Sequence, residues 1–276
     1  MQKLIAALKG SKKPLIFCMV HLRALPGTPQ NLGTIDSISK KAVEEAQCYA
    51  KYGIDGIIVE NMGDVPYVQS STFSPETIAF MTRCAIDIKN SLNCCGNLFF
   101  GINLLASRNR EALAVALSSG YDFIRCEGYV FAHVADEGFT NACAGDLLRY
   151  RKLIGAENVS VLADIKKKHS AHAITADVDL IETAESAKFF LADAVVVTGT
   201  MTGKAADPKE VSEIRSSIPE LPIFVGSGVT TENVNQFMNA SGLIVGSHFK
   251  KDGHWSNELD EKKISTFMES FRKANK

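Results

Sequence analysis

The chain has 276 residues, of which 46% are apolar and 22% charged, and its formal net charge is −1. These values are typical of a globular protein, and they argue against an extensively disordered chain and against nucleic-acid binding through bulk positive charge. No apolar run approaches the length needed to span a bilayer, so we expect no integral membrane segment. Because the net charge is close to zero, we also expect no nucleic-acid partner.

The seven cysteines form an odd set without any Cys-x-x-Cys pair, and most lie in apolar surroundings. This usage indicates reduced thiols and a cytoplasmic protein. The first ten residues, "MQKLIAALKG", place basic residues around a short apolar stretch. That stretch is too short for a secretory signal, while a short mitochondrial presequence stays open as an alternative.

In chain order, apolar runs rich in β-branched and aromatic residues predict eight strands, near residues 15–22, 55–61, 98–105, 122–128, 159–166, 193–199, 222–229 and 242–249. Segments with helical periodicity lie between many of them, and a last helical segment follows the eighth strand over residues 258–274. Strands alternating with helices predict parallel strands covered by helices. We therefore predict one α/β domain over residues 1–276, a single (β/α)8 TIM barrel.

Polar residues follow the apolar part of each predicted strand. In a barrel these carboxyl ends share one face, where barrel enzymes place their active sites. On the fifth strand, the period-two alternation puts Leu162, Asp164 and Lys166 on one side, with Val161 and Ala163 on the other. We expect Asp164 to point into the barrel.

These residue types predict proton transfer and substrate binding at the strand ends. The candidate catalytic residues are Asp164, His21, Glu60 and His169. The candidate substrate-binding residues are Asn61, Asn103, Arg125, Lys166, Lys168 and Thr198. For Arg125 the alternative is a structural ion pair with Glu127 or Glu60.

Glycine and serine residues end the seventh and eighth strands, in "VGSGVTTEN" and "VGSHFK". Small residues there let a substrate approach backbone N–H groups, as in many barrels that bind phosphate. We expect phosphate to bind at Gly226, Ser227, Gly228, Gly246 and Ser247. The alternative is that these glycines only fit a crowded rim.

A divalent metal is a further alternative, because His169 and His172 lie three residues apart, with Asp164, Glu60 and His133 as further candidate ligands. No tight metal-binding motif accompanies them. We therefore assign no residue as a metal ligand and keep the divalent metal as an alternative. The sequence indicates no other cofactor.

The stretches "MVHLRALPGTP", "GIDGIIVENMGDVPY", "GINLLASR", "DFIRCEG", "LADIKKKHS", "VVVTGTMTG", "VGSGVTTENV" and "GSHFKKDGHWSNELD" occur in this order. In this combination the chain resembles the BtpA/SgcQ family over nearly its whole length, which implies a TIM barrel. It departs from the family pattern after the fifth strand, where "KKKHSAH" replaces a Val-Lys-His-Ala ending but Lys168 and His169 keep the Lys-His pair. Near the C-terminus, "NELD" stands where the family has Asn-Pro-Val-Asp.

The residues and the resemblance together leave two functions of different classes open. The strand-end residues favour a phosphate-binding enzyme, and the resemblance implies either function, because the family is associated with photosystem I biogenesis while some members are described as nucleosidases. The first is an enzyme acting on a phosphorylated small molecule, a nucleoside or sugar phosphate, as a lyase, isomerase or nucleosidase-type hydrolase. The second is a non-catalytic biogenesis factor that uses the barrel as a scaffold. The polar strand ends favour the enzyme. The apolar stretch "FFLADA" at residues 189–194 is compatible with a homo-oligomer.

Overall fold

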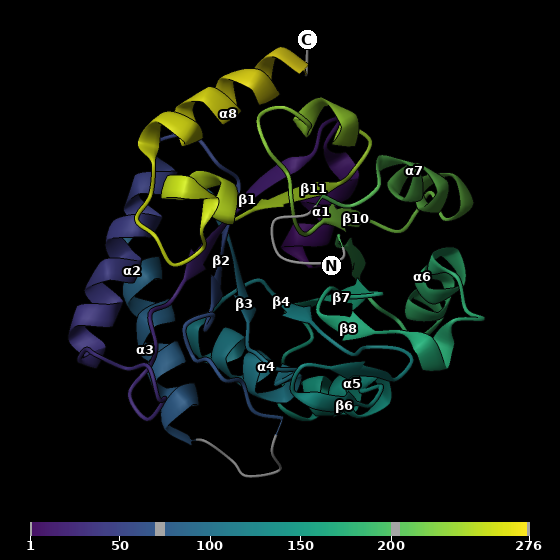
Figure 1. Ribbon diagram of the computed structural model, residues 1–276, viewed down its shortest axis with the longest axis horizontal. Helices are drawn as coiled ribbons and strands as arrows, with labels where there is room; N and C mark the ends of the chain where they lie inside the picture. The colour runs from purple at the N-terminus through teal and green to yellow at the C-terminus, as the bar shows by residue number, and fades with distance from the viewer. Residues whose placement is uncertain (1, 70–74, 200–204, 275–276) are drawn as a thin grey trace.

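A closed barrel of parallel strands forms the centre of the protein (Figure 1). The structure, a computed structural model, describes residues 2–69, 75–199 and 205–274. Within these ranges eight strands close the barrel in the order β1-β11-β10-β9-β7-β4-β3-β2. They are β1 (Leu15–His21), β2 (Gly56–Glu60), β3 (Phe99–Asn103), β4 (Phe123–Cys126), β7 (Ser160–Ile165), β9 (Ala194–Val197), β10 (Ile223–Val225) and β11 (Gly242–Val245). Each lies inside a predicted range, and the predicted TIM-barrel fold is confirmed.

Helices surround the barrel (Figure 1). They are α2 (Ile35–Ala50), α3 (Pro75–Ser91), α4 (Asn109–Ser119), α5 (Ala144–Leu153), α6 (Leu180–Phe189), α7 (Pro208–Ser217) and α8 (Glu261–Ala274). Local sequence defines several of their ends: the Thr34 hydroxyl accepts the Ser37 N–H before α2, and Asp179 and Glu182 form a capping box at α6. Between β10 and β11 a short 3-10 helix, η2 (Val234–Phe237), is found where the repeat would place an α-helix.

Alternation along the strands separates two apolar cores. Side chains such as Val161, Ala163 and Ile165 face the helices, whereas Phe17, Phe123, Leu162 and Phe224 fill the barrel interior. Phe123 packs edge-to-face on Phe17, with ring centroids 5.5 Å apart. The interior is therefore a packed core with no pore through this layer.

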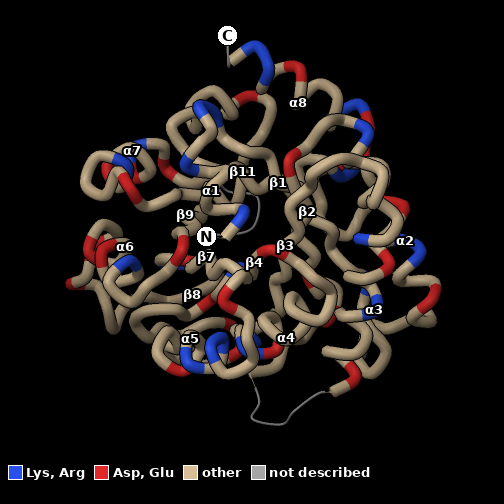
Figure 2. Tube along the Cα trace, turned by 180° about the vertical axis from the view of Figure 1, so that it is seen from behind, with Lys and Arg blue, Asp and Glu red and all other residues tan. Residues whose placement is uncertain are grey.

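A helix that was not predicted from the sequence closes one end of the barrel. Helix α1 (Lys3–Gly10) buries Leu4, Ile5 and Leu8, which pack with the interior cluster. Figure 2 shows α1 over the middle of the ring of strands, seen from behind. The short apolar stretch at the N-terminus thus serves as a plug for the amino-terminal end of the barrel.

A small antiparallel sheet was also not predicted. Strands β5 (His133–Ala135) and β6 (Gly138–Thr140) form a hairpin between β4 and α5, and β8 (Ser170–Ala171) pairs with β5. The segments before β5 and before β8 both leave the carboxyl ends of barrel strands. The hairpin turn, with Asp136 and Glu137, therefore lies over that end of the barrel.

Among the described residues, no helix combines the length and the apolar character required to cross a bilayer.

Candidate active site

Two adjoining cavities occupy the carboxyl end of the barrel. The larger has a volume of about 420 Å³ and the smaller about 190 Å³. Both are lined by Glu60, Met62, Arg125, Lys168, Ser247 and Gly253. A small molecule with two chemically different parts could therefore place one part in each cavity.

Strand register assembles the central polar group. Parallel pairing places His21 beside Glu60, Glu60 beside Asn103, and Asn103 beside Arg125 on four successive strands. His21 Nε2 lies 3.4 Å from Glu60 Oε2, and the Asn103 amide donates a hydrogen bond to Glu60 Oε1. These four predicted residues, far apart in the chain, thus meet in one layer across the cavities.

Burial changes the protonation behaviour of this layer. Removal from water, together with the charges of Lys250, Lys168 and Arg125, lowers the pKa of His21 from 6.5 to about 3. Burial raises the pKa of Glu60 above its ordinary value, although Arg125 and Lys168 oppose this change. The imidazole is therefore neutral near pH 7, and the carboxyl group holds its proton more tightly than an exposed glutamate does.

Asp164 points into the barrel, as the strand alternation predicts, but it does not line either cavity. Both of its oxygens accept hydrogen bonds from Arg125, Nε to Oδ1 and Nη2 to Oδ2, each at 2.8 Å. Burial alone would lower the pKa of Arg125, but the Asp164 carboxylate more than offsets it and raises that pKa. The ion-pair partner of Arg125 is therefore Asp164, where the sequence suggested Glu127 or Glu60.

The residues after β7 point in different directions because two of them adopt left-handed backbone conformations. Lys166 has φ 47° and His169 has φ 55°. The Lys166 ammonium donates to the Thr175 carbonyl oxygen at 2.8 Å, away from both cavities, whereas Lys168 lines both. Strained backbone of this kind gathers at functional sites.

Among the described residues, Lys168 and Arg125 are the two cations that line both cavities. The surroundings of Lys168 shift its pKa. Burial lowers its pKa and Arg125 adds to that effect, while the carboxylates of Glu60, Asp164 and Glu127 oppose it. Its backbone N–H donates to Thr198 Oγ1 at 3.1 Å. The Thr198 hydroxyl therefore contacts the loop that carries Lys168.

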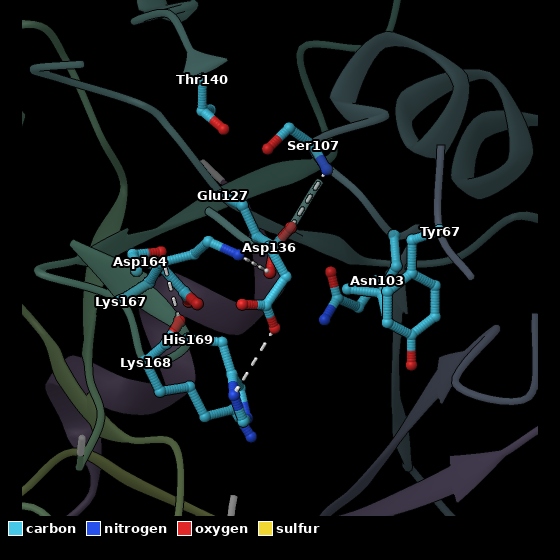
Figure 3. Close-up of polar contacts among 12 residues, drawn as sticks. Tyr67, Asn103, Ser107, Glu127, Asp136, Thr140, Asp164, Lys167, Lys168 and His169 are labelled. Atoms are coloured by element: carbon cyan, nitrogen blue, oxygen red, sulfur yellow. Dashed lines mark hydrogen bonds and ion pairs between the residues drawn. The ribbon is translucent and has the colours of Figure 1, made fainter. Parts of the chain in front are cut away.

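Glu127 was not among the predicted site residues, yet it lines the larger cavity, and its carboxylate lies between Ser107 and Lys167 (Figure 3). It accepts the Ser107 N–H at 3.0 Å and lies 3.2 Å from the Lys167 ammonium. His169 Nδ1 lies 4.0 Å from Asp136 at the hairpin turn. The signal for Glu127 was present in the sequence, because it directly follows the fourth strand, whereas nothing local placed Asp136 over the barrel.

The predicted phosphate-binding residues lie together. Gly226, Ser227, Gly228, Gly246 and Ser247 all line the smaller cavity. A Cβ atom on Gly226 would lie 2.5 Å from Val196 Cγ1, and one on Gly246 would lie 3.0 Å from His21 Cε1. The rim is therefore crowded at these glycines, and it still leaves space above them. The Ser227 hydroxyl accepts the Gly199 N–H at 2.9 Å.

Asn61 lies outside this group of residues. Its amide donates to Asp64 Oδ2 at 2.9 Å, and its carbonyl oxygen accepts the Leu105 N–H at 2.8 Å. Asn61 lines a different, smaller cavity between loops. It connects the loops that follow β2 and β3.

The described ranges contain no group of three or more His, Cys, Asp or Glu side chains placed to hold a metal ion. The candidate ligands are divided among other contacts: His172 Nε2 lies 3.0 Å from the Lys167 carbonyl oxygen, and the rings of His133 and His172 are 5.4 Å apart. His169 and Asp164 have the contacts given above.

Aromatic side chains that the sequence did not assign as binding residues complete the larger cavity. Tyr67, His254 and Trp255 line it, and the rings of His254 and Trp255 stack with centroids 5.8 Å apart. Tyr67 and His254 stood out in the sequence only as parts of longer motifs, because no short motif marks an aromatic wall built from separate loops.

Solved structures support the fold. Phosphoribosyl anthranilate isomerase from Thermus thermophilus superposes with a TM-score of 0.58 at 11% identity, covering 94% of this chain and 98% of that one. Orotidine 5'-phosphate decarboxylase from Pyrococcus horikoshii superposes with a TM-score of 0.56 at 14% identity, covering 94% and 99%. At these identities the likeness shows a shared barrel and nothing more.

Sequence relatives cover nearly the full chain. An uncharacterized Caenorhabditis elegans protein, F13E9.13, named as mitochondrial, is 48% identical over 96% of this chain and 95% of its own length. The predicted cytoplasmic location therefore stays a prediction. The photosystem I biogenesis protein BtpA of Synechocystis is 30% identical over 94% of this chain and 88% of its own. The BtpA family model matches residues 11–273, and the chain belongs to the BtpA family.

Proposed function

We propose that this protein is an enzyme that acts on a phosphorylated small molecule, a sugar or nucleoside phosphate, at the carboxyl end of the barrel. One observation carries the proposal. The glycine- and serine-lined cavity shares Arg125, Lys168 and Glu60 with the larger cavity. A phosphate-sized space thus adjoins groups able to transfer protons.

Phosphate binding would use backbone and charge together. Gly226 to Gly228 and Gly246 to Ser247 allow close approach, and Arg125 and Lys168 supply positive charge to the same space. Two solved barrels with this fold are named for phosphoribosyl and 5'-phosphate compounds. For this chain, that likeness supports the phosphate only as part of the proposal.

Proton transfer would use Glu60 and His21. Glu60 lines both cavities, whereas Asp164 holds Arg125 with both oxygens. We therefore assign the general base to Glu60 and make Asp164 a positioning residue for Arg125. His21 would exchange the proton with Glu60 at 3.4 Å, and Asn103 would orient the Glu60 carboxyl group.

The larger cavity would hold the non-phosphate part of the substrate. Carboxylates of Glu60, Glu127 and Asp136 can accept hydrogen bonds from hydroxyl groups, and Trp255 and Tyr67 offer apolar faces. Lys168 could stabilise negative charge on an oxygen as Glu60 removes a neighbouring carbon-bound proton. This arrangement favours isomerase or lyase chemistry over cleavage of a glycosidic bond.

A thermal-shift panel of sugar phosphates, nucleoside phosphates, free sugars, nucleosides and inorganic phosphate tests the binding step. A ligand at one hundred times its dissociation constant adds about 2.7 kcal/mol to the free energy of unfolding. Ser247→Glu should abolish the shift by placing negative charge in the smaller cavity. Ser216→Glu, on the exposed side of α7, is the matched control and should leave the shift unchanged.

Turnover is tested with the compounds that bind. Glu60→Gln should retain the thermal shift but lose turnover, because the amide cannot accept the substrate proton. Release of a free base from nucleoside phosphates would instead support the nucleosidase reaction. The enzyme proposal fails if no phosphorylated compound binds, or if Glu60→Gln turns over at the wild-type rate.

A scaffold function is the second candidate, and an exposed apolar surface supports it. Phe189, Phe190 and Leu191 at the end of α6 are 81%, 48% and 68% exposed. A relative named for photosystem I biogenesis belongs to the same family. In that case Phe189→Asp would abolish the cellular function while Glu60→Gln would leave it intact.

A further inference from the structure

Two thiols lie in contact behind the larger cavity. Cys126 is the last residue of β4 and Cys143 immediately precedes α5, and their sulfur atoms are 3.8 Å apart. Cys126 is fully buried, whereas Cys143 is partly exposed. The two thiols are in hydrogen-bonding contact, in which either sulfur can donate, and their side chains would have to rotate toward each other to reach the bond length of about 2.05 Å of a disulfide.

The surroundings distinguish the two thiols. The hydrogen bond from Cys126 lowers the pKa of Cys143, and the Asn109 amide, at 3.3 Å from its sulfur, acts in the same direction against the effect of burial. Burial raises the pKa of Cys126 well above its ordinary value. Thiolate is the reactive form, so the more exposed thiol is also the more readily ionised one.

These thiols also have a direct connection to the cavity. The Asn109 amide that contacts Cys143 donates to the Glu127 carbonyl oxygen at 2.7 Å, and Glu127 directly follows Cys126. The chain between the thiols, residues 127–142, contains the β5–β6 hairpin with Asp136 and Glu137. A bond between the sulfurs would close this segment into a loop at its base.

We propose that Cys143 and Cys126 form an oxidation site: hydroperoxides convert Cys143 to a sulfenic acid, and Cys126 resolves it to a disulfide. The inference goes beyond the proposed function and does not depend on it, because it follows from the two thiols.

The two steps balance with a hydroperoxide as the oxidant. The Cys143 thiolate attacks one peroxide oxygen, so that an S–O bond forms, the O–O bond breaks and, with hydrogen peroxide, water is released after protonation. Cys126 sulfur then attacks the Cys143 sulfur, an S–S bond forms, and the S–O bond breaks. The departing hydroxide takes the Cys126 thiol proton, giving a second water. Both thiols are oxidised and the peroxide is reduced.

For the active site, the consequence is that the two ends of the segment carrying the β5–β6 hairpin would be covalently joined. The disulfide would link the end of β4, next to Arg125 and Glu127, to the start of α5. Motions that separate the hairpin from the barrel would be restricted. Oxidation would thus regulate access to the larger cavity, whatever compound that cavity binds.

The test uses the full chain with Cys94→Ser and Cys95→Ser, because those two thiols are exposed and would consume oxidant. The reduced, folded protein is treated with hydrogen peroxide, quenched, denatured and alkylated, and its peptides are analysed by mass spectrometry. We expect a peptide pair linked through Cys126 and Cys143, with two hydrogen atoms lost, reversed by dithiothreitol. The buried Cys84 should stay reduced during the oxidation, be recovered in its alkylated form, and serve as the internal control.

Two variants separate the roles of the thiols. Cys126→Ala should accumulate a Cys143 sulfenic acid that dimedone traps, and Cys143→Ala should leave Cys126 unreactive. Recovery of both thiols as alkylated in the oxidised wild-type pair, or dimedone labelling of Cys126 in Cys143→Ala, would overturn the proposal. The first measurement requires no folded variant of either residue.

Hydrogen exchange tests the connection to the site. Amides of residues 133–140 should exchange more slowly after oxidation and return to their original rates after dithiothreitol. Unchanged rates in fully crosslinked protein would overturn the regulatory role.

Discussion

The two ends of one barrel have opposite chemistry although the same strands build both. Toward the amino-terminal end, Phe17, Phe123 and Phe224 fill the interior, and α1 covers it with Leu4 and Leu8. At the carboxyl end, the next inward-facing positions are His21, Glu60, Asn103, Arg125 and Asp164. Within a strand, the change from one chemistry to the other takes two residues: Ile58 to Glu60, Phe123 to Arg125, and Leu162 to Asp164.

This difference shows how a barrel can keep a polar site without losing its core. The apolar layers supply the burial that stabilises the fold, and the charged groups of the polar layer pair with one another. Two buried atoms of that layer, His21 Nδ1 and Asn103 Oδ1, have no hydrogen-bond partner among the described residues. Arg125 is paired with Asp164, and Glu60 with Asn103 and His21. Substitutions at the two ends should therefore separate stability from ligand binding.

Arg125→Met should have the largest effect, because it leaves the Asp164 carboxylate buried without its cation. We expect a loss of about 3–5 kcal/mol in the free energy of unfolding, measured by urea denaturation, together with loss of the phosphate-induced thermal shift. The double variant Arg125→Met/Asp164→Leu should recover most of the stability but none of the binding. A single variant as stable as the wild type would show that the pair does not support the polar layer.

The pH dependence of stability should identify the neutral histidine. The folded pKa of His21, about 3, lies below its ordinary value of 6.5. The contribution of neutral His21 to the free energy of unfolding is therefore complete above pH 6.5. It is lost as the pH falls toward about 3, because the histidine of the unfolded chain takes up a proton at a higher pH than the folded one does.

His21→Gln should remove this term, so that the variant loses less stability than the wild type between neutral pH and pH 4. The difference should be on the order of 2–3 kcal/mol, measured by urea denaturation at each pH. Glu60, whose pKa is raised, has an effect of the opposite sign: its contribution to the stability of the protein falls as the pH rises above the ordinary pKa of a glutamate. Parallel wild-type and variant curves would contradict the buried, neutral imidazole.

Gly226→Ala should test the crowded rim of the smaller cavity. The new Cβ would lie 2.5 Å from Val196 Cγ1 and 3.1 Å from Thr198 Cγ2. We expect a loss of about 1–3 kcal/mol from overpacking, with weaker phosphate binding in the same thermal-shift assay. Gly10→Ala, at a position with open space around it, is the matched control. Unchanged stability and binding in Gly226→Ala would mean that the rim adapts to the methyl group.

Ile58→Val should have the smallest effect and mark the apolar side of the boundary. Ile58 is fully buried in the barrel interior, two residues before Glu60. Loss of one methylene group should cost about 0.5–1.5 kcal/mol in denaturation experiments and leave ligand affinity unchanged. A marked loss of affinity would show that the apolar layer also shapes the site.

Much of this architecture could be predicted because it depends on local pattern. The eight strands were recognisable from their apolar runs, and Asp164 was placed inside the barrel by period-two alternation. The glycines of the seventh and eighth strands were grouped because carboxyl ends of parallel strands share a face. Lys166 shows the limit of that reasoning: left-handed backbone after β7 turns its ammonium to Thr175, and Lys168 lines the cavities in its place.

The sequence by itself determined the barrel, the polar end and the family resemblance, because alternation and strand-end chemistry are properties of short segments. Only the tertiary structure decided which polar groups pair. Asp164 holds Arg125, Asn61 joins two loops, Asp136 comes over the barrel on a hairpin, and Cys126 meets Cys143. These contacts join residues from different strands and loops, so their geometry depends on barrel closure and strand register, which no short segment contains.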